Sequence, residues 1–432
     1  MAPSQVGYAP NLEKFLKSLK GQPLEASIEN LVSLLKRRQI AGSEQCAIAT
    51  AHILLQVVAK AKWTDVDQLL ERVQRTGRKL VEARPQELVL SNVVRRVLRL
   101  IRDEAEEDRN GNGEFGTDSV PDLQALPPKD DESTVSRSSS FRPPALSSTS
   151  SYNVPQSMFN LLSASPLVDS TGTGSPFGNS GSSTPVSHAQ PASIHALRSE
   201  VIDGIEEIKD EISSADDQIA TFAEIQIHPD DFVLVYKPSP TVERFLIRAA
   251  AKRKFTVLLA GGDISPSATA GANDAPFGAL RKKLASAGVK SIVLLNSGVM
   301  AFMPRVNKVI LGARAVVANG GVIADGGAGL VARAAHEYHK SVVVLSGVYK
   351  LCPEDAFNLD GLVEYGDPSA FVSFANGPMV GGVGVQSIIT EFIQPELVDV
   401  YISNLGPHSR DHLQGIINDH YKKEDIDFLM QE

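Results

Sequence analysis

Apolar side chains in the first hundred residues recur three and four positions apart, which is the spacing of an amphipathic helix. Leu12, Phe15 and Leu19 follow this spacing, and similar stripes continue through the following segments. Ser43 precedes a long apolar stretch and is a good residue for a helix N-cap. The pattern predicts a small antiparallel helical domain over residues 1–108.

Residues 109–193 break this pattern. Ser, Gly, Pro and Thr dominate the segment, and its apolar residues follow no period. A segment of this composition cannot bury enough apolar surface to offset the entropy lost on ordering. We expect a disordered insert. Ser165, Ser175 and Thr184 each precede a proline and are candidate phosphorylation sites, but an unmodified flexible tether is the simpler interpretation.

A heptad-like stripe follows the insert. Apolar residues from Ile194 to Phe222 alternate steps of three and four. This alternation predicts a long connecting helix within residues 194–230, with an apolar seam that faces another helix. Packing against the first domain is the simplest use of the seam, and a partner surface is the alternative.

From residue 231 onward, short continuous apolar runs alternate with helical segments. The runs cover residues 232–236, 255–260, 291–295, 308–312, 315–318 and 341–345. Such runs separated by helices are typical of a parallel sheet buried on both faces. The sequence therefore predicts an α/β fold, with a Rossmann-like, doubly wound domain over residues 231–432. Ligands of such domains bind at the carboxyl ends of the strands.

Composition narrows the function classes. The 432 residues carry 42 basic and 51 acidic side chains, a net charge of 42 − 51 = −9. This chain lacks the basic footprint that direct nucleic-acid binding needs. Its two cysteines, Cys46 and Cys352, lie far apart without metal-ligand spacing, which favours a reducing compartment. No apolar stretch approaches the ~20 residues that span a bilayer, so we expect no membrane partner and a cytoplasmic, cytosolic location.

Two local patterns invite a chemical interpretation. Gly326, Gly327 and Gly329 open a predicted helix, where backbone N–H groups can cradle a phosphate. The P-loop lysine and the full dinucleotide spacing are missing, so a tight turn is the better interpretation. His336 and His339 lie three residues apart without an evident third metal ligand. We therefore predict no catalytic residue, no metal ligand and no cofactor.

Residues 299–321, VMAFMPRVNKVILGARAVVANGG, resemble the signature of the regulatory subunits of translation initiation factor 2B. Sugar-phosphate isomerases, including methylthioribose-1-phosphate isomerase, share that family's fold. Further similar stretches cover residues 91–104, 241–260 and 395–406. Of the family's alpha, beta and delta classes, the beta class is the most similar.

The resemblance implies a non-catalytic regulatory subunit of the complex that exchanges guanine nucleotide on translation initiation factor 2. It implies that the α/β domain mediates oligomerisation, with the delta subunit as closest partner and the alpha, gamma and epsilon subunits in the same assembly. Epsilon carries the exchange catalysis. The regulatory core recognises factor 2, especially its alpha subunit, and senses phosphorylation of that subunit.

The related isomerases use a cysteine and an aspartate as acid and base. The matching positions here are Lys237 and Arg314, and arginine cannot act as a base near neutral pH. This change argues against isomerase activity. A sugar-phosphate isomerase or sugar-phosphate-binding sensor remains the alternative function. The stretch 259–283 also differs from the family pattern, since it is longer and richer in Gly and Ala.

Loops and predicted strand ends supply the candidate partner contacts, because binding residues concentrate there. These residues are Lys237, Ser239, Arg305, Asn307 and Lys308. For Arg305 and Lys308, a purely local role in tying the sheet edge is the alternative.

Overall fold

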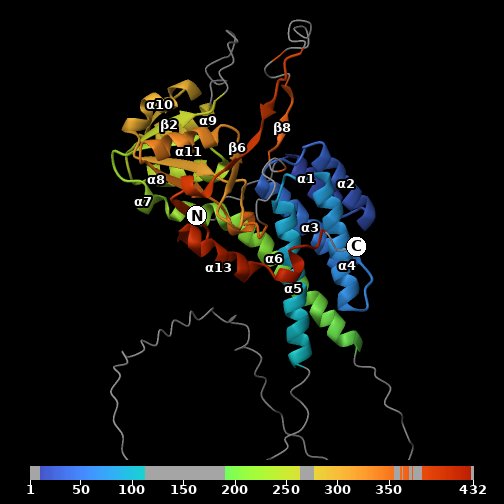
Figure 1. Cartoon of the computed structure of the whole chain (residues 1–432). Coiled ribbons are helices and arrows are strands. Elements are labelled where there is room, and N and C mark those ends of the chain that lie inside the picture. Colours follow the sequence, from blue (N-terminus) through green and yellow to red (C-terminus); the bar gives the residue numbers. More distant parts are fainter. Residues whose placement is uncertain are drawn as a thin grey trace, which may run out of the picture. The chain divides into compact units, whose positions relative to one another are not determined.

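The computed structural model (Figure 1) describes residues 10–111, 190–262, 277–354, 361, 363–368, 372 and 382–429. Most of the predicted insert and half of the 259–283 stretch lie outside the described residues, so disorder and phosphorylation of the insert stay predictions. The described residues belong to one compact unit, Met1–Glu114 with Ala189–Glu432. The finer division into domains at residues 108, 193 and 230 also stays a prediction.

Between residues 10 and 111 the chain forms five helices whose apolar stripes meet in one buried core. Leu31, Ile48, Leu54 and Val94 are fully buried in this core. The predicted N-terminal helical architecture is therefore confirmed. In chain order the helices are α1 (Pro10–Ser18), α2 (Leu24–Lys36), α3 (Ser43–Lys60), α4 (Val66–Ala83) and α5 (Val89–Gly111).

The long helix α6 (Gln190–Thr221) joins these helices to the sheet. Its apolar seam packs within the chain, since Val201, Ile205 and Ile212 belong to the same buried core as the first helices. Ile219, near its C-terminal end, belongs instead to the core beneath the sheet. A single helix therefore contributes to both cores.

Seven strands form the main sheet in the order β12-β11-β7-β4-β1-β2-β3, and every pairing is parallel except that of β12 with β11. This arrangement confirms the predicted α/β, doubly wound fold. The strands are β1 (Phe232–Tyr236), β2 (Thr256–Ala260), β3 (Lys290–Val293), β4 (Lys308–Gly312), β7 (Ser341–Leu345), β11 (Val400–Ser403) and β12 (Gly406–His408).

Helices cover both faces of this sheet, which explains the continuous apolar runs of its strands. One face packs against α6, α8 and α9, and the other against α10, α11 and α13. These helices are α8 (Pro240–Ala250), α9 (Gly278–Ser286), α10 (Val299–Phe302), α11 (Ala328–Glu337) and α13 (Arg410–His420), while the short α7 (Ala223–Gln226) follows α6.

The apolar run 315–318 does not join the parallel sheet, contrary to the prediction. It supplies only β5 (Ala315–Val316), which pairs antiparallel with β6 (Val322–Asp325) across a turn at Asn319 and Gly320. Gly320 has a φ of 89°, and the Asn319 side chain accepts a hydrogen bond from the Gly321 N–H at 2.8 Å. An Asn-Gly pair favours a hairpin turn. Here the turn folds the chain back, so the apolar run forms a short hairpin instead of a strand of the main sheet.

Smaller strands complete the architecture. β6 also pairs with β10 (Thr390–Ile393), and β8 (Tyr365–Gly366) pairs with β9 (Ser387–Ile388). The prediction that Ser43 caps a helix is wrong. Gly42 precedes α3, and the Ser43 hydroxyl instead donates a hydrogen bond to the Arg314 carbonyl at 3.3 Å. This contact links the helices to the α/β part of the chain.

Candidate functional site

A cavity of about 370 Å³ lies at the carboxyl ends of β1 and β4. The chain order of the strands reverses between these neighbours, with β2 and β3 on one side and β7 on the other. Ligands of doubly wound sheets bind at such a switch point. The N-terminus of α3 and Asp216 of α6 form the opposite wall, so both parts of the chain build the cavity.

Three cations line the cavity, and each already binds another group of the protein. The Arg314 guanidinium lies 2.6 Å from the Asp325 carboxylate. The Lys237 ammonium donates to the Gly326 carbonyl at 3.2 Å. Lys350 is buried and donates to the Ala313 carbonyl at 3.1 Å. Burial lowers the pKa of Lys350, because a charged amine is poorly solvated there.

Two carboxylates on the helical side face these cations. Asp216 accepts a hydrogen bond from the Thr241 hydroxyl at 2.7 Å, and Arg244 lies 3.9 Å away. Glu44 has no hydrogen-bond or ion-pair partner among the described residues. Burial, with the nearby charge of Asp216, raises the pKa of Glu44. Glu44 is therefore the acidic group of this cavity whose charge is least compensated.

Backbone strain collects at the cavity wall. Lys237 and Phe277 both line it and have φ values of 39° and 60°. Non-glycine residues rarely adopt positive φ, and such strain concentrates at functional sites. The close approach of Gly261 contributes, since a Cβ there would lie 2.7 Å from the Lys237 side chain. The wall is therefore held in a specific shape.

The structure divides the predicted contact residues between opposite ends of the sheet. Lys237 and Ser239 line the cavity, and the Ser239 hydroxyl caps α8 by accepting from the Val242 N–H at 3.4 Å. Asn307 and Lys308 lie at the amino end of β4, about 13 Å from its carboxyl end at ~3.3 Å per residue. These residues do not form one continuous site.

At the amino end, two predicted residues make local bonds. The Asn307 side chain accepts from the Phe232 N–H at 2.9 Å, and the Lys308 ammonium donates to the Gln226 carbonyl. The local role weighed for Lys308 is thus present in the structure. Arg305 is exposed in a short 3₁₀ turn. Whether any of the five candidates touches a partner stays a prediction.

The glycine cluster forms a tight turn, as its spacing indicates. Gly327 has a φ of 101°, and a Cβ there would lie 1.9 Å from the Tyr236 hydroxyl. The Gly329 N–H donates to the Glu391 carboxylate, which thus occupies the N-terminus of α11. Elsewhere in the described part of the chain, no three His, Cys, Asp or Glu side chains gather as a metal site would require.

Sequence reasoning missed Glu44, Asp216 and Lys350. Each comes from a different segment, so no spacing rule connects them. Only a weak indication in the sequence pointed to Asp325, namely that it directly precedes the glycine cluster. By contrast, the resemblance pointed to Lys237 and Arg314, and the fold brings both to the same cavity.

Comparison with known proteins identifies the class to which this chain belongs. The family model of the initiation factor 2 subunit family matches residues 39–409, so the chain belongs to that family. Within it, the similarity is to translation initiation factor eIF2B subunit beta. The subunit from Schizosaccharomyces pombe is 33% identical over 402 residues, covering 92% of this chain and 96% of that protein.

Solved structures agree with this placement. The crystal structure of eIF2B beta from Chaetomium thermophilum is 46% identical, with a TM-score of 0.67 and coverage of 98% of this chain and 100% of that chain. A chain of the tetrameric eIF2B-beta2-delta2 complex from the same organism is 45% identical, with a TM-score of 0.64 and coverage of 94% and 99%. The predicted similarity to the beta class of this family is confirmed.

No described helix combines the length and the apolar character that crossing a bilayer requires.

Proposed function

We propose that this chain is a regulatory subunit of the cytosolic complex that exchanges guanine nucleotide on translation initiation factor 2. Its similarity to eIF2B beta subunits over nearly its whole length supports this role. The delta subunit is its closest partner, and alpha, gamma and epsilon subunits complete the assembly. Contact with the alpha subunit of factor 2 lets the assembly sense phosphorylation of that subunit.

The position and permanent charge of Arg314 support the non-catalytic part of the proposal. An isomerase needs an acid and a base that exchange protons with the sugar. Lys237 and Arg314 occupy the matching positions in one cavity, and a guanidinium does not release its proton near neutral pH. The pair with Asp325 holds the guanidinium in place. This geometry favours a structural cavity over a reactive one.

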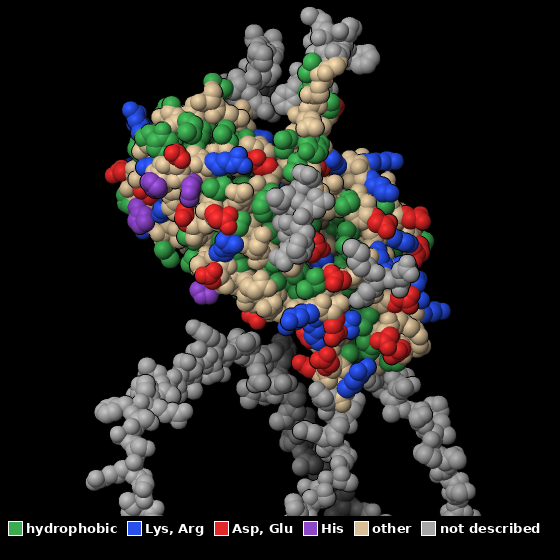
Figure 2. Space-filling view, viewed as in Figure 1, with side chains coloured by type: hydrophobic (Ala, Val, Ile, Leu, Met, Phe, Trp, Pro, Cys, Tyr) green, Lys and Arg blue, Asp and Glu red, His purple; other side chains and the backbone are tan. Residues whose placement is uncertain are grey.

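An exposed apolar surface supports assembly through the α/β part of the chain. Leu295, Met300 and Leu330 are 56%, 44% and 51% exposed. Met300 lies on α10 and Leu330 on α11, which pack against each other. Figure 2 shows hydrophobic side chains gathered over the region of α9 and α10. Apolar area of this kind marks interaction sites, and we assign it to the delta-type partner.

Native mass spectrometry of the tagged protein, isolated gently from its own cells, tests the assembly. A complex with several distinct subunits, some related to this chain, is expected. Met300→Glu should release the delta-type subunit, because a charge in an apolar contact lacks solvation. Leu405→Glu is the matched control, since Leu405 is 57% exposed on a different turn. A homodimer without related subunits would overturn the proposal.

The sensor alternative keeps one observation in its favour, the strained cavity at the strand switch point. Calorimetry with a pentose phosphate tests it directly. Saturable heat that disappears in Arg314→Ala would support a sensor, and turnover would be required for an isomerase. Because Arg314, Lys237 and Lys350 already bind other groups of the protein, we expect no heat of binding for a sugar phosphate.

A further inference from the structure

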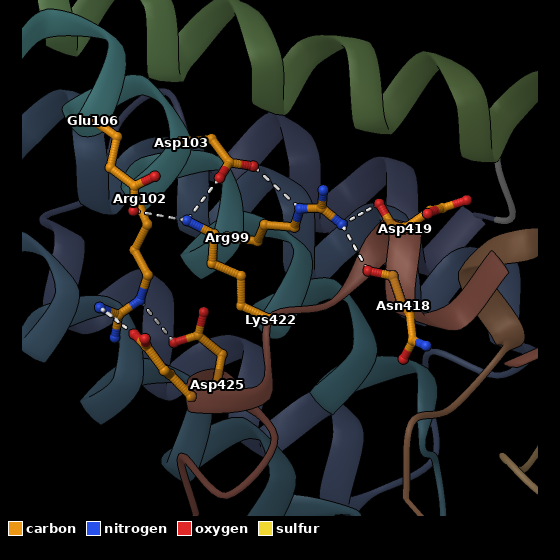
Figure 3. Close-up of polar contacts among 9 residues, drawn as sticks. Arg99, Arg102, Asp103, Glu106, Asn418, Asp419, Lys422 and Asp425 are labelled. Atoms are coloured by element: carbon orange, nitrogen blue, oxygen red, sulfur yellow. Dashed lines mark hydrogen bonds and ion pairs between the residues drawn. The ribbon is translucent and has the colours of Figure 1, made fainter. Parts of the chain in front are cut away.

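The C-terminal residues fold back from the sheet onto the first helices. After α13 ends at His420, the chain crosses to α5 and runs along it as far as Leu429. We call residues 421–429 the tail. On α5, Arg95, Arg99 and Arg102 are spaced by four and three positions and so share one face of the helix. This arginine face is where the tail lies (Figure 3).

Charged groups join the two segments in both directions. Arg102 binds the Asp425 carboxylate at 3.1 Å and the Glu424 carboxylate at 3.3 Å. Lys422 reaches back to Asp103 at 2.8 Å and to Glu106 at 3.0 Å. Figure 3 shows these contacts converging between helix and tail. Lys422, Glu424 and Asp425 of the tail therefore each pair with an opposite charge on α5.

The last turn of α13 extends the same contact. The Arg99 guanidinium donates to the Asp419 carbonyl, and to the Asn418 carbonyl at 3.4 Å. The same guanidinium binds the Asp103 carboxylate at 3.1 Å. Because the last carbonyls of a helix lack partners within it, a cation there stabilises the end of α13.

An aromatic anchor completes the contact. Phe428 is 0% exposed and belongs to the core of the first helices. Its socket depends on Gly77, where a Cβ would lie 3.1 Å from the Phe428 ring. The buried Arg95 guanidinium lies 5.4 Å from the ring centroid and donates to the Ile426 carbonyl at 2.9 Å. Arg95 thus binds both the anchor and the backbone of the tail.

We propose that the arginine face of α5 and the socket at Gly77 form a seat for an acidic peptide with one aromatic residue, and that the tail is its built-in, releasable occupant. The seat is built from α4 and α5, whose other core contacts do not involve the tail. At the start of the tail, Tyr421 is buried in the core of the α/β part, and its hydroxyl donates to the Leu351 carbonyl at 2.7 Å.

One polar atom of the tail lacks a partner among the described residues. One carboxylate oxygen of Asp425 is buried and has no hydrogen-bond partner in the described part of the chain. Such an oxygen forfeits its hydration without a replacement. An acidic segment of another protein that satisfied the same arginines would therefore compete with the tail. When the tail is bound to α5, it holds the first helices against the α/β part. When the tail is released, the arginine face is free to bind another segment.

Hydrogen exchange on the full chain tests the latch. Phe428→Ala empties the socket and should accelerate amide exchange in the tail and in residues 89–102 at least tenfold, while strands β1 and β4 stay unchanged. Asp427→Ala is the matched control, because Asp427 is an exposed acid of the same tail. Arg102→Ala removes only ion pairs and should accelerate the tail about threefold. It serves as the second variant if Phe428→Ala does not fold.

Binding in trans tests the seat. A labelled peptide of residues 418–429 should bind the Phe428→Ala chain at least tenfold more tightly than the unaltered chain in fluorescence anisotropy. The same peptide with Asp425→Lys should bind at least tenfold more weakly. Equal binding to both chains, or none, would overturn the seat. Unchanged exchange in both Phe428→Ala and Arg102→Ala would overturn the latch.

Discussion

The Arg314 guanidinium lies 2.6 Å from the Asp325 carboxylate at the mouth of the sheet cavity. Both side chains are about one-third exposed, at 33% and 30%. Such a pair contributes only about 0.5–1 kcal/mol, because water screens it and two side chains lose freedom. Its main effect is geometric, since it holds a cation where the related isomerases have an aspartate.

Replacing this arginine by the isomerases' residue should not create an enzyme. Arg314→Asp places two carboxylates side by side, so we expect a loss of about 1–2 kcal/mol of unfolding free energy and no sugar-phosphate turnover. Urea unfolding and an isomerase assay measure the two effects. Asp325→Asn in the same background should recover part of the stability. Turnover in Arg314→Asp would show that Lys237 can serve as the second group.

The turn before α11 should tolerate no side chain. Gly327→Ala combines a φ of 101° with a Cβ only 1.9 Å from the Tyr236 hydroxyl, so it should cost about 2–4 kcal/mol. Gly415→Ala is the control, because it lies inside α13 with no atom within 4 Å of the added Cβ. That variant should gain about 0.5–1 kcal/mol. Equal unfolding midpoints in urea for both variants would contradict this account.

Sequence periodicity predicted the elements better than their ends. The seam of α6 and five of the apolar runs lie where the pattern put them, because long apolar stripes must be buried. The run 315–318 failed, since periodicity ignores the turn at Asn319 that folds it back. The predicted N-cap at Ser43 was wrong for a related reason. The Ser43 hydroxyl donates to the carbonyl of Arg314, a residue distant in sequence.

The candidate site was predictable only in part. Lys237 and Arg314 were identified by resemblance to a family motif, and the fold brings both to one cavity. Glu44 and Lys350 carry no local signature, because their role arises from burial and from neighbours distant in sequence. Asn307 and Lys308 follow the same kind of strand-end pattern as Lys237, yet they lie at the opposite end of the sheet. Pattern alone does not distinguish the two ends.

His52 should make the chain sensitive to mild acid. Burial, aided by the charge of Lys209, lowers its pKa from 6.5 to about 4. Between these values the unfolded chain binds more protons than the folded one, so the folded state loses stability as pH falls. The loss approaches about 2 kcal/mol after screening is allowed for. His52→Gln should flatten this dependence in urea unfolding from pH 7 to pH 4. An unchanged slope would exclude His52 as its source.

Glu44 should act in the opposite pH direction. Burial and Asp216 raise its pKa above 4.5, while Arg244 and Lys350 oppose the shift. A raised carboxyl pKa means that the folded chain holds the proton more tightly, so ionisation of Glu44 costs stability as pH rises through the raised value. Glu44→Gln removes that cost.

The variant should therefore gain about 0.5–1 kcal/mol at pH 7.5, consistent with partial burial, and much less at pH 4, where Glu44 is mostly protonated in the folded and the unfolded chain. Urea midpoints at the two pH values measure the difference. Gln45→Glu provides a neighbouring control, since it adds a carboxylate to the same first turn of α3. A gain that persists at pH 4 would show that packing, and not charge, sets the contribution of Glu44.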